Sequence, residues 1–189
     1  MKKIVLASGS PRRKELLEQI GVEFTIVKSD ILEKVDTTLP PSDIPKELSR
    51  QKAEDVCANL NDEDVIVIGA DTVVSADGEI LGKPKDKEDA YKMLKKILGK
   101  RHEVYTGVTF SRKSKGEILS TSYSVCTYVD VCDMSKEEID EYLNTDEPYD
   151  KAGGYAIQGI FAKYIKGIEG DFYNVVGLPI SLVYENIKK

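Results

Sequence analysis

An almost purely aliphatic run, Val65 to Ile68, lies in the first half of the chain and leads directly into Gly69-Ala70-Asp71. Apolar residues without polar alternation are typical of a central strand that is covered on both faces. The small residues before Asp71 let a ligand come close to the backbone. An acid at this place costs free energy unless it is paired, hydrated or bound to a metal. Asp71 is therefore a candidate functional residue, and the alternative is that it caps a local turn through Thr72.

Other patterns along the chain predict strands and helices in alternation. A strand over 3–8 leads into a helix from Pro11 that stops at Gly21, and 29–45 is a proline-containing loop. Further predicted elements are a strand over 23–28, a helix over 46–60, a hairpin turn at Asp77-Gly78, a helix capped by Asp86 and closed by Gly99, an antiparallel pair over 103–112 and 118–131, a helix from the capping box Ser135/Glu138 to about Leu143, a strand over 161–165 and a last helix from Pro179. The fold class is α/β, with a mixed, partly antiparallel twisted sheet flanked by helices.

Composition limits the class of protein. The 189 residues fit one domain, and a net charge of -6 argues against a nucleic acid or a membrane surface as partner. The sequence has no apolar run of membrane-spanning length and no signal peptide at its start, so we expect a cytoplasmic protein. Three cysteines, Cys57, Cys126 and Cys132, fit neither paired disulfides nor a metal motif, and we expect buried free thiols. A His-based zinc site or a Ser-His-Asp triad would need the single histidine, His102.

The first predicted helix begins with two arginines, in the run Ser8-Gly9-Ser10-Pro11-Arg12-Arg13. Ser10 is placed as the N-cap and Pro11 as the first helical residue. The first turn of a helix carries partial positive charge, which repels Arg12 and Arg13 unless an anion binds there. The segment predicts an anion site, and the alternative is that both arginines point into water.

Three further polar residues are candidates for a binding site. Lys83 lies between Gly82 and Pro84, which hold it in a defined turn, although a solvated surface lysine is the alternative. Lys52 lies on a predicted helix, where a charged residue is usually only solvated. The glycine-rich stretch 150–159 fits no phosphate-loop pattern and indicates tight turns. Within it, the amide of Gln158 offers the donor and the acceptor that reading a base edge requires.

Taken together, these segments resemble the Maf family of nucleoside triphosphate pyrophosphatases, in order along nearly the whole chain. The motifs that carry the resemblance are Ser8-Gly9-Ser10-Pro11-Arg12-Arg13, Lys52-Ala53, Gly69-Ala70-Asp71-Thr72-Val73-Val74, Gly82-Lys83-Pro84, Thr106-Gly107-Val108, Asp150-Lys151-Ala152-Gly153-Gly154-Tyr155 with Gln158-Gly159, and Asn174-Val175-Val176-Gly177-Leu178-Pro179. The resemblance implies a single domain over residues 1–189 with the mixed α/β fold of inosine triphosphate pyrophosphatases. It also implies a metal-dependent, homodimeric enzyme that cleaves a nucleoside triphosphate between the α and β phosphates. A link of the family to septum formation leaves a nucleotide-sensing regulator of cell division as the alternative.

By the same resemblance, Asp71 matches the catalytic proton acceptor and Glu33 a second acidic position. Arg12, Thr72 and Gln158 match the positions that separate subgroups, and here they are similar to the subgroup acting on dTTP and UTP. Leu32 stands where the family often has an acidic residue before its glutamate. This departure bears on the alignment of Glu33 with the family's second acidic position. Ser49 replaces a common alanine.

These residues support a hydrolysis in which cations neutralise phosphate charge and a positioned water attacks. Polyphosphate would be bound by Arg12, Arg13, Lys52 and Lys83, with Ser8 to Ser10 holding phosphate oxygens at the helix start. Glu33 and Asp71 would hold Mg²⁺ or Mn²⁺, and Asp71 would take the proton of the water. Thr72 and Gln158 would match a uracil or thymine edge. The mechanism needs no nucleophilic Cys, Ser or His.

Overall fold

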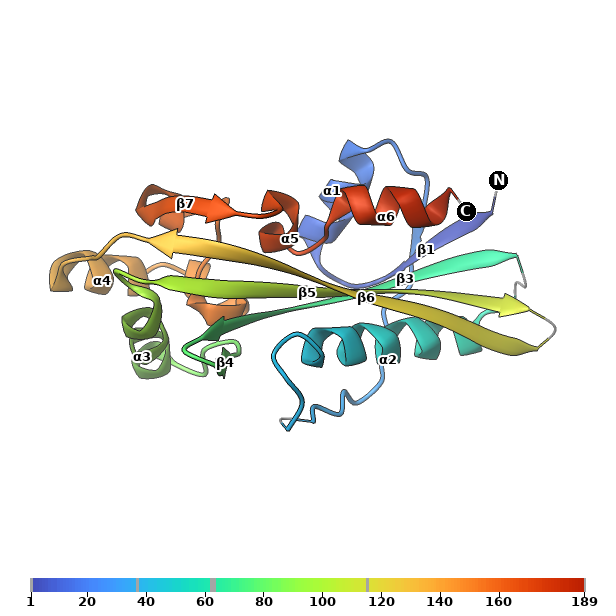
Figure 1. Cartoon of the computed structure of the whole chain (residues 1–189), viewed down its shortest axis with the longest axis horizontal. Coiled ribbons are helices and arrows are strands. Elements are labelled where there is room, and N and C mark those ends of the chain that lie inside the picture. The colour runs from blue at the N-terminus through green and yellow to red at the C-terminus, as the bar shows by residue number, and fades with distance from the viewer. Residues whose placement is uncertain (1, 37, 62–63, 115, 189) are drawn as a thin grey trace. The chain divides into compact units, whose positions relative to one another are not determined.

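The computed structural model describes residues 2–36, 38–61, 64–114 and 116–188. In these residues, seven strands form one sheet in the order β2-β1-β3-β5-β6-β7, and β4 pairs with β3. The strands are β1 (Lys3–Ala7), β2 (Thr25–Ile26), β3 (Val65–Ala76), β4 (Glu79–Leu81), β5 (Arg101–Ser114), β6 (Glu117–Val131) and β7 (Ile165–Glu169). β1 pairs in parallel with β2 and β3, whereas the β3–β4 and β6–β7 pairs are antiparallel. The predicted mixed sheet is confirmed (Figure 1).

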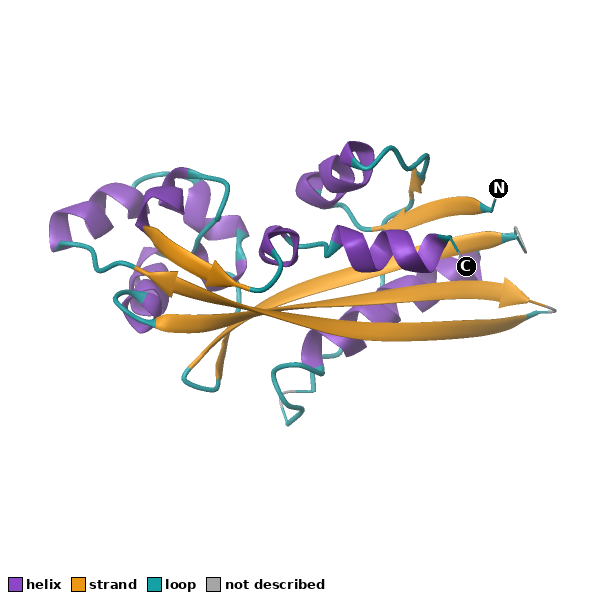
Figure 2. Cartoon of the chain, turned by 45° about the horizontal axis from the view of Figure 1, so that its top comes forward, coloured by secondary structure: helices purple, strands orange, loops and turns teal. Residues whose placement is uncertain are grey.

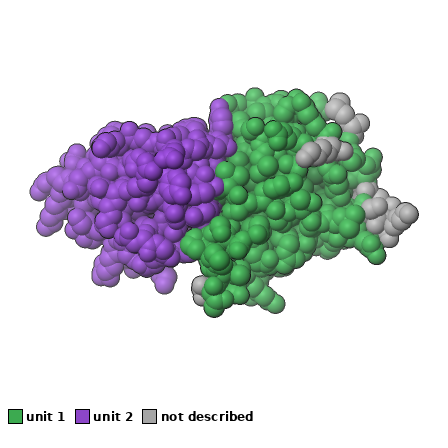
Figure 3. Space-filling view, in the orientation of Figure 1, with its two compact units in different colours: residues 1–71, 106–125, 177–189 green, residues 72–105, 126–176 purple. Residues whose placement is uncertain are grey.

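Helices flank this sheet, as Figure 2 shows. They are α1 (Pro11–Gln19), α2 (Ile44–Asn59), α3 (Lys87–Ile97), α4 (Lys136–Leu143), α5 (Phe172–Val176) and α6 (Ile180–Ile187), with short 3-10 helices η1 (Glu147–Asp150), η2 (Ala152–Gly154) and η3 (Ile160–Tyr164). The described residues divide into two compact units, coloured separately in Figure 3. The first unit holds residues 1–71, 106–125 and 177–189, and the second holds 72–105 and 126–176. The long strands β3, β5 and β6 contribute residues to both. The single domain over 1–189 stays a prediction.

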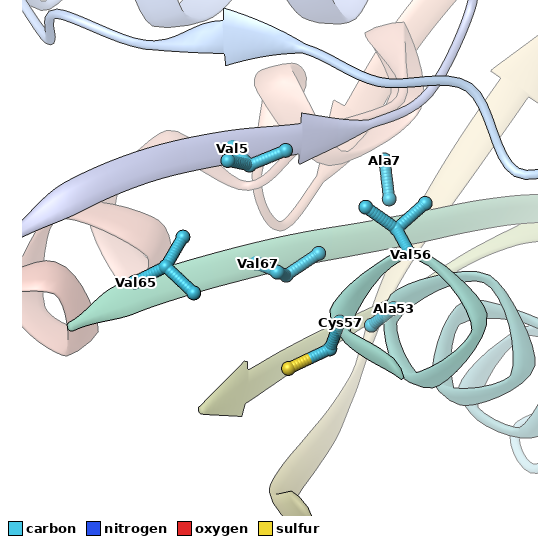
Figure 4. Packing of buried hydrophobic residues seen from close by; sticks show 7 residues of the cluster. All are labelled: Val5, Ala7, Ala53, Val56, Cys57, Val65 and Val67. Atoms are coloured by element: carbon cyan, nitrogen blue, oxygen red, sulfur yellow. The ribbon is translucent and has the colours of Figure 1, made fainter. Parts of the chain in front are cut away.

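The first unit has an apolar core between α2 and the strands β1 and β3 (Figure 4). Its side chains are aliphatic apart from one thiol and are all buried: Val5, Ala7, Ala53, Val56, Cys57, Val65 and Val67. Figure 1 shows α1 and α6 on one face of the sheet and α2 on the other. The covering of β3 on both faces explains why its first residues are uninterruptedly aliphatic, as the sequence predicts.

Two glycines let α2 lie unusually close to the sheet. A Cβ on Gly69 of β3 would stand 2.2 Å from the carbonyl oxygen of Ser49. A Cβ on Gly107 of β5 would stand 2.1 Å from the carbonyl oxygen of Pro45. Both distances are impossible for a side-chain carbon, so only glycine permits this backbone approach. The helix α2 is thereby held against the sheet at Ser49, about one helical turn before Lys52.

The second unit packs around Phe161, whose ring contacts those of Tyr142, Tyr155 and Tyr164 at centroid distances of 4.9–5.5 Å. Asp77 and Gly78 have φ of 52° and 81°, which fits the tight turn predicted between β3 and β4. The side chain of Asp86 accepts the backbone N–H of Asp89, and Ser135 and Glu138 form the predicted capping box. These local predictions are confirmed.

Several predicted elements were wrong in place or kind. Residues 161–165 fall mostly in η3, and the strand β7 begins only at Ile165. The reason is that the Glu147 carboxylate accepts the N–H groups of Ile160 and Phe161, which starts a helical turn. The predicted strand over 23–28 shrinks to β2, and α2 begins at Ile44, so Pro45 belongs to its first turn and not to the loop. The helix α5 was not predicted. The thiols are free, but Cys132 is exposed and only Cys57 is fully buried.

Candidate functional site

The candidate site of the first unit lies at the carboxyl end of β1, beside the middle of β3, because β3 runs through Asp71 to Ala76 and does not end before this acid as the sequence predicts. Ala7, the last residue of β1, is opposite Gly69 of β3 in a parallel register, so Ser8 leaves the sheet next to the part of β3 that carries Asp71. After β1 the chain adds β2 on one side, and after α2 it adds β3 on the other, so the strand order reverses here. Ligands of open α/β sheets bind in the crevice that such a reversal creates.

The run after β1 is held by Arg13, which is the second arginine of α1. Its Nε donates to the carbonyl of Gly177 at 2.8 Å, and its Nη1 donates to Ser8 Oγ at 3.2 Å. Ser8 Oγ also accepts the backbone N–H of Ser10 at 3.2 Å. Ser10 precedes the helix in extended conformation, but its own hydroxyl makes no capping bond. The N-cap position is confirmed, whereas the expected side-chain cap is absent at this residue.

The pKa of Arg13 responds to the charges of the candidate acids Asp71 and Glu33. Burial lowers the pKa of Arg13, the negative charges of Asp71 and Glu33 raise it, and the charge of Arg12 lowers it. A guanidinium nevertheless remains protonated in proteins. Arg13 therefore places a positive charge at the start of α1. Its guanidinium already donates to two oxygens, the Gly177 carbonyl and Ser8 Oγ. Arg12, in the same helical turn, is partly exposed.

Lys52 brings the two candidate acids together. Its Nζ lies 2.5 Å from Asp71 Oδ1 and 3.2 Å from Glu33 Oε1. The side chains of Lys52 and Asp71 are each 15% exposed, and that of Glu33 is 42% exposed. Asp71 comes from β3, Lys52 from α2 and Glu33 from the irregular segment after β2. The structure thus joins three of the residues that the sequence singled out.

This donor set fits a divalent cation bound together with a substrate. Mg²⁺ is typically held by one or two carboxylates plus phosphate oxygens. Glu33 and Asp71 supply the two carboxylates, and they converge on the one ammonium group of Lys52. Over the described residues, no group of three or more His, Cys, Asp and Glu side chains could hold a metal ion without other ligands.

The remaining candidates, Thr72, Lys83 and Gln158, belong to the second unit. Thr72 is partly buried in β3, and Lys83 is exposed in the turn after β4. This turn is fixed by the glycine-rich segment, because Gly153 N–H donates to the Gly82 carbonyl at 3.0 Å. Gly153 and Gly154 have φ of 71° and 73°, which glycine adopts without strain.

Gln158 is exposed, and the chain directly after it is fixed by Glu147. The carboxylate of Glu147 accepts the N–H groups of Ile160 at 2.6 Å and Phe161 at 3.1 Å, as well as the hydroxyl of Tyr142 at 3.0 Å. A Cβ on Gly159 would stand 2.1 Å from this carboxylate. The glycine beside Gln158 therefore makes room for the acid that shapes its loop.

Known proteins resemble this chain over nearly its whole length. The family model described as "Maf-like protein" matches residues 3–189. The chain belongs to this family. A relative from Agathobacter rectalis named dTTP/UTP pyrophosphatase is 48% identical over 201 residues, covering 100% of this chain and 98% of the relative. Relatives with the same name from Lachnoclostridium phytofermentans and Caldicellulosiruptor saccharolyticus are 47% and 50% identical, over 100% and 95% of this chain and 95% and 90% of their own.

His102 of this Maf-like protein has no place in the first unit's site. It lies in the second unit, is buried, and its Nε2 is 2.7 Å from the hydroxyl of Tyr155. Its ring also packs edge-on against that of Tyr155, with 5.3 Å between the ring centroids. Among the described residues, no helix is long and apolar enough to cross a membrane.

Sequence reasoning missed three polar residues of the Maf-like protein that hold its loops. Besides Glu147, Asn174 is buried and donates to the Val104 carbonyl at 2.9 Å and to Thr127 Oγ1 at 3.0 Å, which links β5 and β6. Gln51 holds the segment that carries Glu33. Asn174 belongs to a quoted motif, but Glu147 and Gln51 resemble ordinary surface residues, and their partners are distant in sequence.

Proposed function

We propose that this Maf-like protein hydrolyses dTTP and UTP between the α and β phosphates, releasing a nucleoside monophosphate and pyrophosphate. Full-length similarity to relatives named dTTP/UTP pyrophosphatase supports the reaction. The observation that carries the proposal is the convergence of Asp71 and Glu33 on Lys52, in the middle of β3 beside the carboxyl end of β1. This arrangement provides both acid and cation where an α/β sheet binds ligands.

In the proposed reaction, Asp71 orients a water molecule that attacks one phosphorus of the α–β anhydride. The carboxylate accepts the proton of this water as the new P–O bond forms and the anhydride bond breaks. Lys52 positions Asp71 in the free protein and turns to the phosphate oxygens when the triphosphate binds. Arg13 and the N–H groups at the start of α1 hold further phosphate oxygens, and Arg12 adds positive charge there. Lys83, which the second unit carries, is proposed as a further cation for the phosphates.

We further propose that Mg²⁺ or Mn²⁺ is bound by Glu33 and Asp71 together with the triphosphate. When bound, the cation neutralises the charge that gathers on the pyrophosphate. Two carboxylates and an already positioned ammonium support this assignment, because the ammonium marks where positive charge is favourable between them.

Specificity for the base is proposed to reside in Arg12, Thr72 and Gln158. Thr72 and Gln158 offer hydroxyl and amide groups that match the donor and acceptor edge of uracil or thymine. The names of the relatives support the pyrimidine choice.

The family resemblance also supports a homodimer in the cytoplasm, and the net charge of -6 argues against a nucleic acid or membrane partner. Size-exclusion chromatography with light scattering tests the dimer directly, and a monomer at micromolar concentration contradicts it.

The experiment that tests the function is a substrate panel of dTTP, UTP, CTP and GTP, with Mg²⁺ or Mn²⁺ and direct detection of pyrophosphate. We expect release from dTTP and UTP and much less from GTP. A clear preference for GTP contradicts the assignment. The septum-related alternative, a nucleotide sensor, has no observation in its favour and predicts binding of dTTP without turnover.

A further inference from the structure

The acid with the least support from regular structure is Glu33. It follows the two-residue strand β2 and lies in an irregular segment, residues 27–36, without helix or strand. Its neighbour Leu32 is 85% exposed, and Glu33 itself is 42% exposed at the side chain. A carboxylate on such a segment loses conformational freedom when it must face Lys52, and that loss costs free energy unless other bonds hold the backbone.

The face of α2 beside Lys52 supplies these bonds. Gln51 Oε1 accepts the backbone N–H of Lys34 at 3.0 Å, and Gln51 Nε2 donates to the carbonyl of Lys34 at 3.0 Å. One side-chain amide thus satisfies both backbone groups of the residue that directly follows Glu33. These two hydrogen bonds fix the backbone of Lys34, directly after Glu33, in position and in orientation.

The orientation of the amide is itself fixed. Gln51 Nε2 also donates to Glu47 Oε1 at 3.0 Å, and a carboxylate can only accept. Hydrogen bonds from Arg50, with a smaller contribution from Gln51, lower the pKa of Glu47 and keep it ionised. The Gln51 oxygen must therefore face the N–H of Lys34.

A second anchor lies one helical turn further along the same face. Asp55 is four residues after Gln51, and its Oδ2 accepts the hydroxyl of Ser29 at 2.7 Å. Ser29 Oγ accepts the N–H of Ile31 at 3.3 Å. The segment from Ser29 to Lys34 is thus attached to α2 on both sides of the stretch that carries Glu33.

We propose that Gln51 and Asp55 are positioning residues that hold the Glu33 carboxylate at Lys52 and Asp71, so that the cation and the triphosphate meet a preformed pair of acids. The inference rests on the proposed function. Because α2 is fixed by the close approach at Gly69, its side chains form a rigid base for a segment that has none of its own. Neither residue touches the reacting atoms.

The test compares wild-type protein with Gln51→Ala, which keeps a good helix former on an accessible helix face. Hydrogen–deuterium exchange of the Lys34 amide should become about five- to tenfold faster, as expected for one lost hydrogen bond. The Mg²⁺ concentration for half-maximal pyrophosphate release from dTTP should rise about five- to tenfold. At saturating Mg²⁺, kcat should return to within about twofold of wild type, because Glu33 is displaced but present.

Glu54→Ala is the matched control, because Glu54 lies on the same helix and bonds Arg50 within it. It should change neither Lys34 exchange nor the Mg²⁺ requirement. The variant Ser29→Ala should move both readouts in the same direction as Gln51→Ala but less. Faster Lys34 exchange in Gln51→Ala with an unchanged Mg²⁺ requirement overturns the positioning role while the proposed function stands. A wild-type protein that releases no pyrophosphate contradicts the proposed function itself.

Discussion

Lys52 donates to Asp71 across 2.5 Å, and both side chains are largely withdrawn from water. The pair joins α2 to β3 at a point where the helix can approach only because Gly69 has no side chain. When one partner of a largely buried ion pair is removed, the other partner is left as an uncompensated charge. Lys52 and Asp71 therefore act as one unit, in the fold as well as in the proposed reaction.

Asp71→Asn should reduce pyrophosphate release from dTTP by about 10²- to 10⁴-fold, the usual contribution of a general base. The asparagine keeps the size of the side chain and can still accept from Lys52, so the circular dichroism spectrum should not change. Steady-state kinetics of the purified variant provides the measurement. Near wild-type turnover contradicts the role of Asp71.

Lys52→Met should also slow turnover strongly, because it leaves Asp71 and Glu33 without their shared cation. Groups that act as a unit give non-additive losses. The double variant Lys52→Met/Asp71→Asn should therefore be about as slow as the slower single variant. Additive losses, in logarithms of kcat/KM, contradict the coupling.

Arg13→Ala should weaken both binding and stability. It removes the donors to the buried Gly177 carbonyl and to Ser8, which should lower the free energy of unfolding by about 1–3 kcal/mol. It also removes a phosphate-binding cation, so KM for dTTP should rise. Arg13→Lys is the matched comparison, since it keeps the charge but not the planar fork. An unchanged KM in both variants excludes Arg13 from substrate binding.

Gly69→Ala and Gly107→Ala should both destabilise the protein, because a methyl group at either position would collide with backbone of α2. Overpacking of this kind costs about 1–3 kcal/mol and more where only backbone can move. Gly167→Ala is the control, because a Cβ there meets nothing within 4 Å. Urea unfolding of the three variants should show losses for the first two only. A neutral Gly69→Ala contradicts the close approach.

Much of the site follows from the sequence because its signals are local. The aliphatic residues 65–68, the small residues Gly69 and Ala70 and the acid Asp71 are contiguous in the sequence. In the same way, the capping box of Ser135 and Glu138 lies within one helical turn. The pairing of Lys52 with Asp71 spans 19 residues, and no pattern of spacing indicates it. The same limit explains the wrong strand at 161–165, whose helical start depends on Glu147 from another segment. Contacts between distant polar residues were thus the part that the sequence could not provide.

The buried His102 predicts a pH dependence of stability. Burial lowers the pKa of His102 from 6.5 to about 4. Between these values the unfolded chain binds a proton at this residue and the folded protein does not, so the free energy of unfolding falls as the pH falls from 6.5 toward 4. The slope is at most about 1.4 kcal/mol per pH unit.

His102→Gln removes this titration and isolates it from that of the carboxylates. Urea unfolding of both proteins at pH 7.0 and at about pH 5 supplies the measurement. The wild-type protein should lose more free energy of unfolding than the variant over this interval. Equal losses in the two proteins contradict a depressed histidine pKa.

The most direct measurement is the release of pyrophosphate from dTTP, UTP, CTP and GTP by wild-type protein and by Asp71→Asn, with Mg²⁺ present. The structure and the relatives predict fast release from dTTP and UTP by the wild-type protein and loss of that release in the variant. Binding of dTTP without pyrophosphate release, or equal rates for the two proteins, would contradict a pyrophosphatase built on Asp71.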